Sequence, residues 1–71
     1  MTHIESGAVK IIQIIGVSEE SWEDAVAQAV SKSADTIKGI SGVEVVAFTA
    51  KVEDGKVVRY NAACKIAFAV S

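Results

Sequence analysis

Few residues in this 71-residue chain are of types that carry out chemistry. There is one cysteine, Cys64, and one histidine, His3, so the chain has neither a disulfide pair nor the cysteine and histidine spacing of a zinc site. No nucleophile and base share a motif, and the sequence has no phosphate-binding loop. The pattern therefore gives no support for catalysis, and we expect a protein that is not an enzyme.

Carboxylates gather at one place, where a helix is predicted to begin. The group consists of Glu19, Glu20, Glu23 and Asp24. Such a group can bind a divalent cation where symmetry brings several copies together. The simpler interpretation, which the sequence favours, is a solvated helix start stabilised by the positive end of the helix dipole. For His3 a solvated tail residue is favoured over a metal ligand.

Basic side chains are scattered along the chain. Seven lysines and arginines against nine acidic residues give a net charge of -2. Without a basic cluster, a track for nucleic-acid phosphates is not expected. Lys51 and Arg59 can hold a phosphate or carboxylate in an assembly, although such residues more often form salt bridges between subunits.

Four elements position these residues. A β-branched run predicts a strand over 9–15, and Ser18 as N-cap predicts a helix from about Glu19 to Lys38, ended by Gly39. The segments 43–53 and 56–70 read as two strands joined by a type I′ turn at Asp54 and Gly55. This order predicts an α+β fold, in which a three-stranded antiparallel sheet wraps around one helix. We expect one domain over residues 8–71 after a flexible tail, residues 1–7.

Trp22 is the only tryptophan and the main candidate for a ligand-stacking ring. If Ser18 is the N-cap, Val17 and Trp22 occupy the two positions of a hydrophobic staple. Trp22 also begins an apolar stripe at steps of three and four. The stripe comprises Trp22, Ala25, Val26, Ala29, Val30, Ser33 and Ile37. We therefore predict that Trp22 belongs to the core between helix and sheet.

The two-residue turn also predicts how the strands pair, beginning with Glu53 opposite Lys56. An uninterrupted ladder gives one apolar face, which includes Cys64, and one face on which charged and apolar side chains are mixed. On the mixed face Phe48 lies opposite Asn61 and Glu44 opposite Lys65. Its apolar content exceeds that of a solvated sheet, so we expect a subunit contact or a ligand surface there.

The overall composition favours self-association. Hydrophobic residues make up 51% of the sequence and the mean hydropathy is +0.38. A domain of this size buries only about 60% of its unfolded surface, so a lone core is marginal. The first residues lack the features of a signal peptide, and no apolar run is long enough to span a bilayer. We expect a cytoplasmic homo-oligomer without membrane partners.

The segments "KIIQIIGVSEESWEDAVAQAV" and "VEVVAFTAKVEDGKVVRYNAACKIAF" together resemble the dodecins along nearly the whole chain. The resemblance is carried by Gly16, Ser18, Ser21, Ala25, Glu44, Val45, Asp54, Gly55, Tyr60 and Phe68. It implies a β-α-β-β subunit in a hollow homododecamer. Members of this family bind riboflavin-type flavins for storage or photoprotective quenching, and some dodecin-like proteins are described as calcium-binding.

The resemblance also implies where a flavin would lie. Flavin-binding dodecins stack the ring on a tryptophan whose position here is Gly42, and they use a glutamine whose position is Asn61. An arginine, glycine, histidine stretch of bacterial members reads Thr49, Ala50, Lys51. The implied ligand-binding residues are Gly42, Val43, Phe48, Thr49, Lys51 and Asn61. Because the stacking ring is missing, binding of FMN or riboflavin is expected to be weak or absent. The alternative is a hollow shell without flavin function that binds ions such as calcium.

Overall fold

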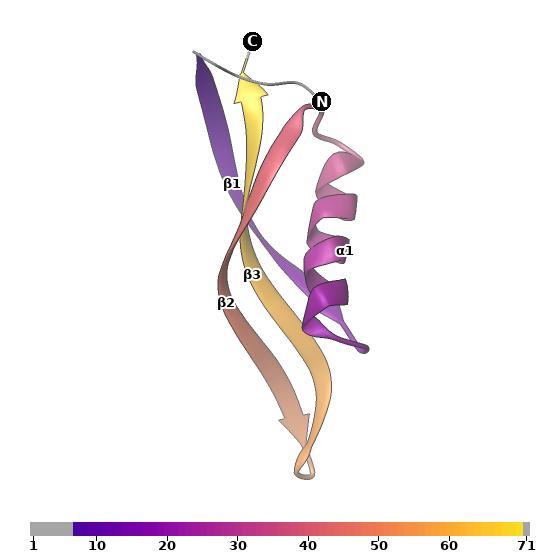
Figure 1. The fold of residues 1–71 in the computed structure, drawn as a ribbon. Coiled ribbons are helices and arrows are strands. Elements are labelled where there is room, and N and C mark those ends of the chain that lie inside the picture. The colour runs from indigo at the N-terminus through magenta and orange to yellow at the C-terminus, as the bar shows by residue number, and fades with distance from the viewer. Residues whose placement is uncertain (1–6, 71) are drawn as a thin grey trace.

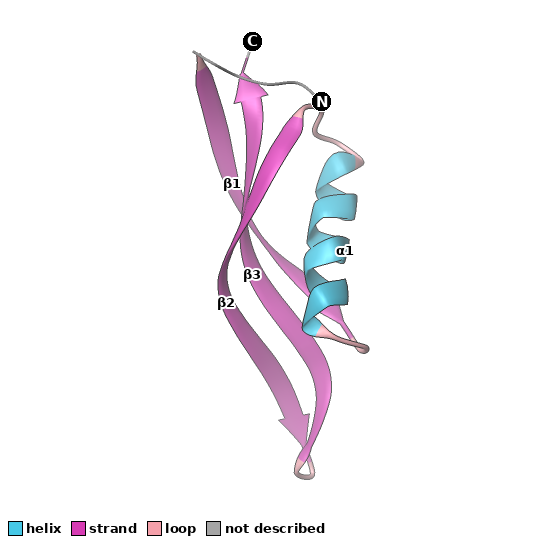
Figure 2. Ribbon diagram, in the orientation of Figure 1, coloured by secondary structure: helices cyan, strands magenta, loops and turns pink. Residues whose placement is uncertain are grey.

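One helix lies against a three-stranded antiparallel sheet in the computed structural model, which describes residues 7–70 (Figures 1 and 2). The elements follow the order β1 (Ala8–Ser18), α1 (Trp22–Ala34), β2 (Ile40–Glu53) and β3 (Lys56–Val70). The longest strand, β3, lies between β1 and β2 and pairs antiparallel with both. The predicted fold class is confirmed. The predicted tail lies outside the described residues except for Gly7, and His3 lies outside them as well.

The helix begins later than the sequence predicted. Ser21 is the N-cap, and its hydroxyl accepts a hydrogen bond from the backbone N–H of Asp24. Ser18 instead ends β1, where its hydroxyl accepts from the N–H groups of Glu20 and Ser21. Both serines can cap a helix, and β1 extends to Ser18 because its pairing with β3 continues to Tyr60. The predicted cap at Ser18 and the staple of Val17 with Trp22 are therefore wrong.

The helix also ends earlier than predicted, at Ala34 rather than Lys38. Hydrogen bonds to Ser33 then tighten the chain, since the N–H groups of Thr36 and Ile37 both donate to its carbonyl oxygen. Gly39 follows at φ +78°, in the left-handed conformation that the sequence predicted for the end of this segment. No helix in residues 7–70 is long and apolar enough to cross a membrane.

The hairpin turn is confirmed, but the pairing of β2 with β3 beyond the turn is not continuous. Asp54 and Gly55 have φ values of 52° and 74°, as a type I′ turn requires, and Glu53 pairs with Lys56. The register shifts by one residue between Lys51 and Val52 and shifts back between Val45 and Ala47. These β-bulges leave Val58 and Val46 out of the ladder.

Between the two bulges, the side chains of β2 face the opposite side of the sheet from the one predicted. The predicted pairs at both ends hold, including Glu44 opposite Lys65, whereas Phe48 lies opposite Ala62 and Thr49 opposite Asn61. The predicted pairing of Phe48 with Asn61 is wrong because an extra residue in one strand moves every later side chain to the other face. No glycine or other turn-forming residue at these positions indicates the bulges in the sequence.

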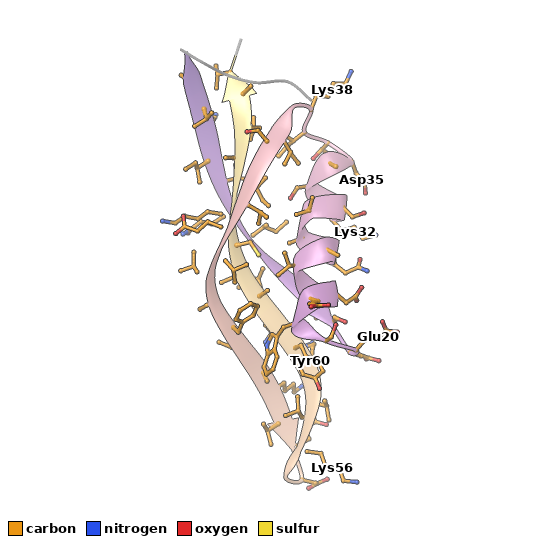
Figure 3. The ribbon with its side chains drawn as sticks, in the orientation of Figure 1. Glu20, Lys32, Asp35, Lys38, Lys56 and Tyr60 are labelled. Atoms are coloured by element: carbon orange, nitrogen blue, oxygen red, sulfur yellow. The ribbon has the colours of Figure 1, made fainter. Side chains whose placement is uncertain are left out.

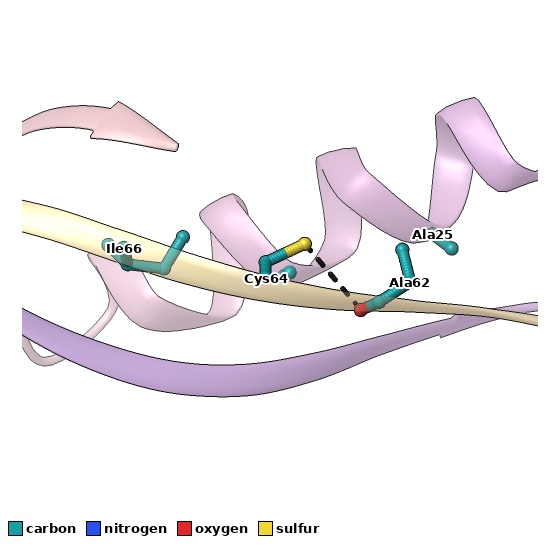
Figure 4. Packing of buried hydrophobic residues seen from close by; sticks show 5 residues of the cluster. Ala25, Ala62, Cys64 and Ile66 are labelled. Carbon is teal, nitrogen blue, oxygen red and sulfur yellow. Dashed lines mark hydrogen bonds between the residues drawn. The ribbon is translucent and has the colours of Figure 1, made fainter. Parts of the chain in front are cut away.

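The hydrophobic core of the chain is small. Its buried hydrophobic residues are Ala25, Ala29, Ala62, Cys64 and Ile66 (Figure 4). The helix approaches β1 so closely that a Cβ at Gly16 would lie 1.9 Å from the carbonyl oxygen of Ala25. The predicted stripe of small residues on α1 therefore packs on the sheet as expected, except at Trp22.

Candidate ligand and assembly surface

The helix covers only one face of the sheet, and the opposite face is bare within a single chain (Figure 1). We call it the uncovered face. Alternation from the buried residues of β3 assigns its members, which are Val9, Ile11, Gln13, Ile15 and Val17 of β1, Arg59, Asn61, Ala63, Lys65, Ala67 and Ala69 of β3, and Gly42, Glu44, Val46, Ala47, Thr49 and Lys51 of β2. Apolar side chains predominate on it. Polar side chains cross it in a row formed by Gln13, Lys65 and Glu44, which lie side by side on the three strands.

The structure brings three of the six predicted ligand residues together on this face. Thr49 and Asn61 are direct cross-strand partners, and Lys51 is two residues along the same strand. Gly42 is on the same face but pairs with Ala67, near the other end of the sheet. Thr49 is the seventh residue after Gly42 in β2, a distance of about 20 Å. A single chain therefore does not unite the predicted set.

The remaining two predicted ligand residues face the helix side of the sheet. Val43 pairs with Ile66 and Phe48 with Ala62, both of which are buried residues of the core. Phe48 is nevertheless 54% exposed. The hairpin extends beyond the start of α1, so the helix covers only part of this side of the sheet (Figure 1). The expectation that Phe48 belongs to the mixed face is wrong for the reason given above, the bulge between Val45 and Ala47.

Phe48 belongs instead to an aromatic cluster with Trp22 and Tyr60. The ring centroid of Trp22 lies 4.8 Å from that of Tyr60 and 6.0 Å from that of Phe48, both in edge-to-face geometry. Figure 3 shows Tyr60 next to the start of the helix. Trp22 is 40% exposed, so the prediction that it is a core residue is wrong. With Ser21 as the cap, Trp22 is the first helical residue and lies over the base of the hairpin.

The carboxylates at the helix start do not form a metal site within the described residues of the chain. Asp24 accepts a hydrogen bond from the hydroxyl of Ser18, 2.7 Å from its Oδ2 atom. Glu19, Glu20 and Glu23 are exposed to solvent, and Figure 3 shows Glu20 pointing away from the sheet. Within residues 7–70 no three histidine, cysteine or carboxylate side chains are close enough to hold a metal ion.

The cations of the hairpin lie together on the uncovered face. The bulge near Val58 places Lys51 opposite Arg59. Two like charges directly opposite each other destabilise a sheet pair unless they are neutralised. Lys51 is neutralised in part by Glu53, whose Oε2 atom lies 3.2 Å from its Nζ atom.

Cys64 is an inert part of the core. It is 2% exposed, and its thiol is 3.5 Å from the carbonyl oxygen of Ala62 (Figure 4). Burial raises the pKa of the Cys64 thiol above its ordinary value. Because the thiolate is the reactive form, burial and the raised pKa both lower the reactivity of this thiol.

A hollow interrupts the uncovered face beside the polar row. It has a volume of about 330 Å³ and is lined by Gln13, Ile14, Ile15, Val46, Ala63 and Cys64. The bulge leaves Val46 without a partner in the ladder, and Ala63 contributes only a small side chain at this point. Sequence reasoning missed the hollow because it predicted an uninterrupted ladder with no bulge at Val46.

Comparisons with known proteins agree with this architecture. The family model described as Dodecin matches residues 8–71. Calcium dodecin of Mycobacterium tuberculosis is 32% identical over 59 residues, which cover 83% of each chain.

Solved structures give the same result. A dodecin from Streptomyces coelicolor superimposes with a TM-score of 0.90 at 22% identity, covering 96% of this chain and 97% of that one. The crystal structure of calcium dodecin from Mycobacterium tuberculosis, described as having a novel calcium-binding site, superimposes with a TM-score of 0.79 at 32% identity, covering 92% and 93%. With the β-α-β-β topology and a family match over nearly its whole length, this chain belongs to the dodecin family.

Proposed function

We propose that the chain assembles into a hollow homododecamer that binds and stores a small ligand, and that it is a binding protein rather than an enzyme. The observation that carries self-association is the imbalance between buried and exposed apolar side chains. Among residues 7–70 five hydrophobic residues are buried, while twelve large ones are exposed. A subunit with so small a core needs further burial to be stable, and other copies of the chain supply it.

The ligand expected from the family is a flavin such as riboflavin or FMN. Asn61, Thr49 and Lys51 offer hydrogen bonds and a positive charge on one apolar face, which suits a planar ring with a polar or phosphorylated side chain. Gly42 lies about 20 Å away in the same subunit. A site that uses both ends of this set therefore combines residues from two subunits. Without a ring at Gly42 the affinity is expected to be low, since aromatic stacking contributes about 0.5–1.5 kcal/mol per pair beyond the buried area.

Native mass spectrometry on protein purified without added flavin tests the assembly, and the absorption spectrum after denaturation tests the ligand. A dodecamer that releases a flavin supports the whole proposal. A dodecamer that releases none and does not bind added riboflavin or FMN contradicts the flavin part. A monomer at micromolar concentration contradicts the assembly.

The substitution Gly42→Trp tests the pocket directly. A Cβ built at Gly42 has no atom within 4 Å, so the first side-chain atom of the new residue meets no clash. The variant is expected to bind flavin more tightly than the wild type and to quench its fluorescence. Gly42→Leu is the matched control, because it adds apolar bulk without a stacking ring. Equal flavin affinity of the two variants would contradict stacking at this position.

A second candidate function is calcium binding by the same kind of shell. It is favoured by the 32% identity to the protein named calcium dodecin. Since residues 7–70 of one subunit hold no metal cluster, the ligands must come from several subunits, and Glu19, Glu20 and Glu23 are the exposed candidates. Titration calorimetry with calcium, with magnesium as control, tests it. No heat of calcium binding to the metal-stripped assembly would contradict this candidate.

A further inference from the structure

We propose that the uncovered face of one subunit packs against the same face of a second copy through a reciprocal contact. In this contact Ile15 of each copy enters the hollow of the other, and Glu44 of each copy meets Lys65 of the other. The inference rests on the proposed self-association and names a surface that carries it.

The shape of the face supports this contact. Ile15 is 64% exposed, the highest value among the large hydrophobic side chains of the described residues. It is one of the residues that line the 330 Å³ hollow, and the other lining residues are apolar apart from Gln13. A protruding side chain beside a cavity that can accept the same side chain is what a two-fold contact requires, because each copy then supplies both parts.

The charges on the face support the same partner. Glu44 and Lys65 are direct neighbours in the ladder, with Gln13 on the far side of Lys65. Among residues 7–70 the only salt bridge is that between Lys51 and Glu53, so Glu44 and Lys65 do not pair with each other in the subunit. When residue i meets j across a two-fold axis, j also meets i, so one acid beside one base makes a surface complementary to itself.

A lipid surface or an unrelated protein fits these observations less well. The row carries one positive and one negative charge, and Glu53 offsets part of the charge of Lys51 and Arg59 at the hairpin end of the face. The face as a whole therefore offers only weak net attraction to an anionic membrane or to a highly charged partner. A second copy supplies both opposite charges at matching positions. It also fills the hollow with a side chain already present on the face. The described features therefore favour a second copy as the occupant.

Charge reversal with mixing tests the contact. Glu44→Lys and Lys65→Glu are each expected to lower the native mass below that of the wild type, because each places like charges across the interface. An equimolar mixture of the two variants is expected to regain the wild-type mass, since one variant then presents only positive and the other only negative charge. An ion pair within one subunit does not produce this recovery. Glu23→Lys, the same change on the exposed helix, is the control and is expected to keep the wild-type mass.

A size test covers the case in which charge reversal prevents folding. Ala63→Phe fills the hollow from within the subunit and is expected to lower the mass, and adding Ile15→Ala to the same chain is expected to restore it. Ala34→Phe, at an exposed helix position, is the control. Folded variants that all keep the wild-type mass, or a mixture that fails to recombine, would overturn the contact while leaving self-association intact. A monomeric wild type would instead overturn the proposed function.

Discussion

The indole of Trp22 donates a hydrogen bond from Nε1 to the main-chain carbonyl oxygen of Thr49, at 2.9 Å. This bond fastens the first residue of the helix to the segment of β2 that lies between the two bulges. The same indole packs edge-to-face on Tyr60. The question of whether the tryptophan binds a ligand or fills the core thus has a third answer, since it joins the helix to the base of the hairpin.

Two replacements of Trp22 distinguish the stability that its hydrogen bond contributes from the stability that its ring packing contributes. Trp22→Phe keeps an aromatic ring and is expected to lower the free energy of unfolding by about 1 kcal/mol through loss of the bond to Thr49. Trp22→Ala also loses the contacts with Tyr60 and Phe48 and is expected to cost about 2–3 kcal/mol. Urea unfolding measures both losses. The protein concentration is kept the same for all variants, because association contributes to the apparent stability. Equal losses in the two variants would contradict a contribution from ring packing.

Gly16 is expected to be the least tolerant glycine. In Gly16→Ala the new Cβ collides with the backbone of Ala25, so the helix must move away from β1. We expect a loss of at least about 3 kcal/mol or failure to fold. Gly42→Ala is the matched control, because the space around Gly42 is open, and is expected to change stability by less than about 0.5 kcal/mol. Thermal unfolding of both variants checks the difference, and a stable Gly16→Ala would contradict the close approach.

The two serines before the helix have different expected effects. Ser21→Ala removes the N-cap and is expected to cost about 1 kcal/mol. Ser18→Ala is expected to cost more, because its buried hydroxyl accepts two backbone N–H groups and donates to Asp24. Denaturant unfolding of the two variants gives the comparison. A larger loss for Ser21→Ala would mean that the cap, and not the network around Ser18, dominates at this end of the helix.

Cys64 makes stability depend on pH in the alkaline range. Burial raises its pKa in the folded protein above the ordinary value of 9.0. As the pH rises, the thiol of the unfolded chain therefore loses its proton before that of the folded protein. The contribution of Cys64 to the free energy of unfolding is complete below pH 9, and it declines as the pH rises through the pKa of the folded protein. The measurement is urea unfolding between pH 7 and 10.5, with Cys64→Ala as the reference for other titrating groups. Identical pH dependence of the two proteins would contradict a raised pKa.

The sequence predicted the elements that depend on local signals. The Asp54 and Gly55 pair fixes the turn by its positive φ values, and the spacing of Ala25, Ala29 and Ser33 identifies the buried side of the helix. The choice between Ser18 and Ser21 as cap was not predictable, because both serines have the right chemistry and the decision depends on how far β1 pairs with β3. The six predicted ligand residues came from the resemblance, and the bulges decide which of them share a face.

The opposed bulges at Val46 and Val58 cancel each other, so residues 42–45 pair with β3 in the same register as the turn. Residues 47–51 lie between the bulges and are inverted with respect to that register, and a third irregularity shifts the register again between Ile40 and Gly42. Removing Val46 and Val58, one residue from each strand, would therefore leave a continuous ladder in which Phe48 still lies opposite Ala62 and Thr49 opposite Asn61. A related chain without the two extra residues can thus present the same side chains on each side of the sheet. An alignment without gaps would shift this segment by one residue and misread the shift as substitution.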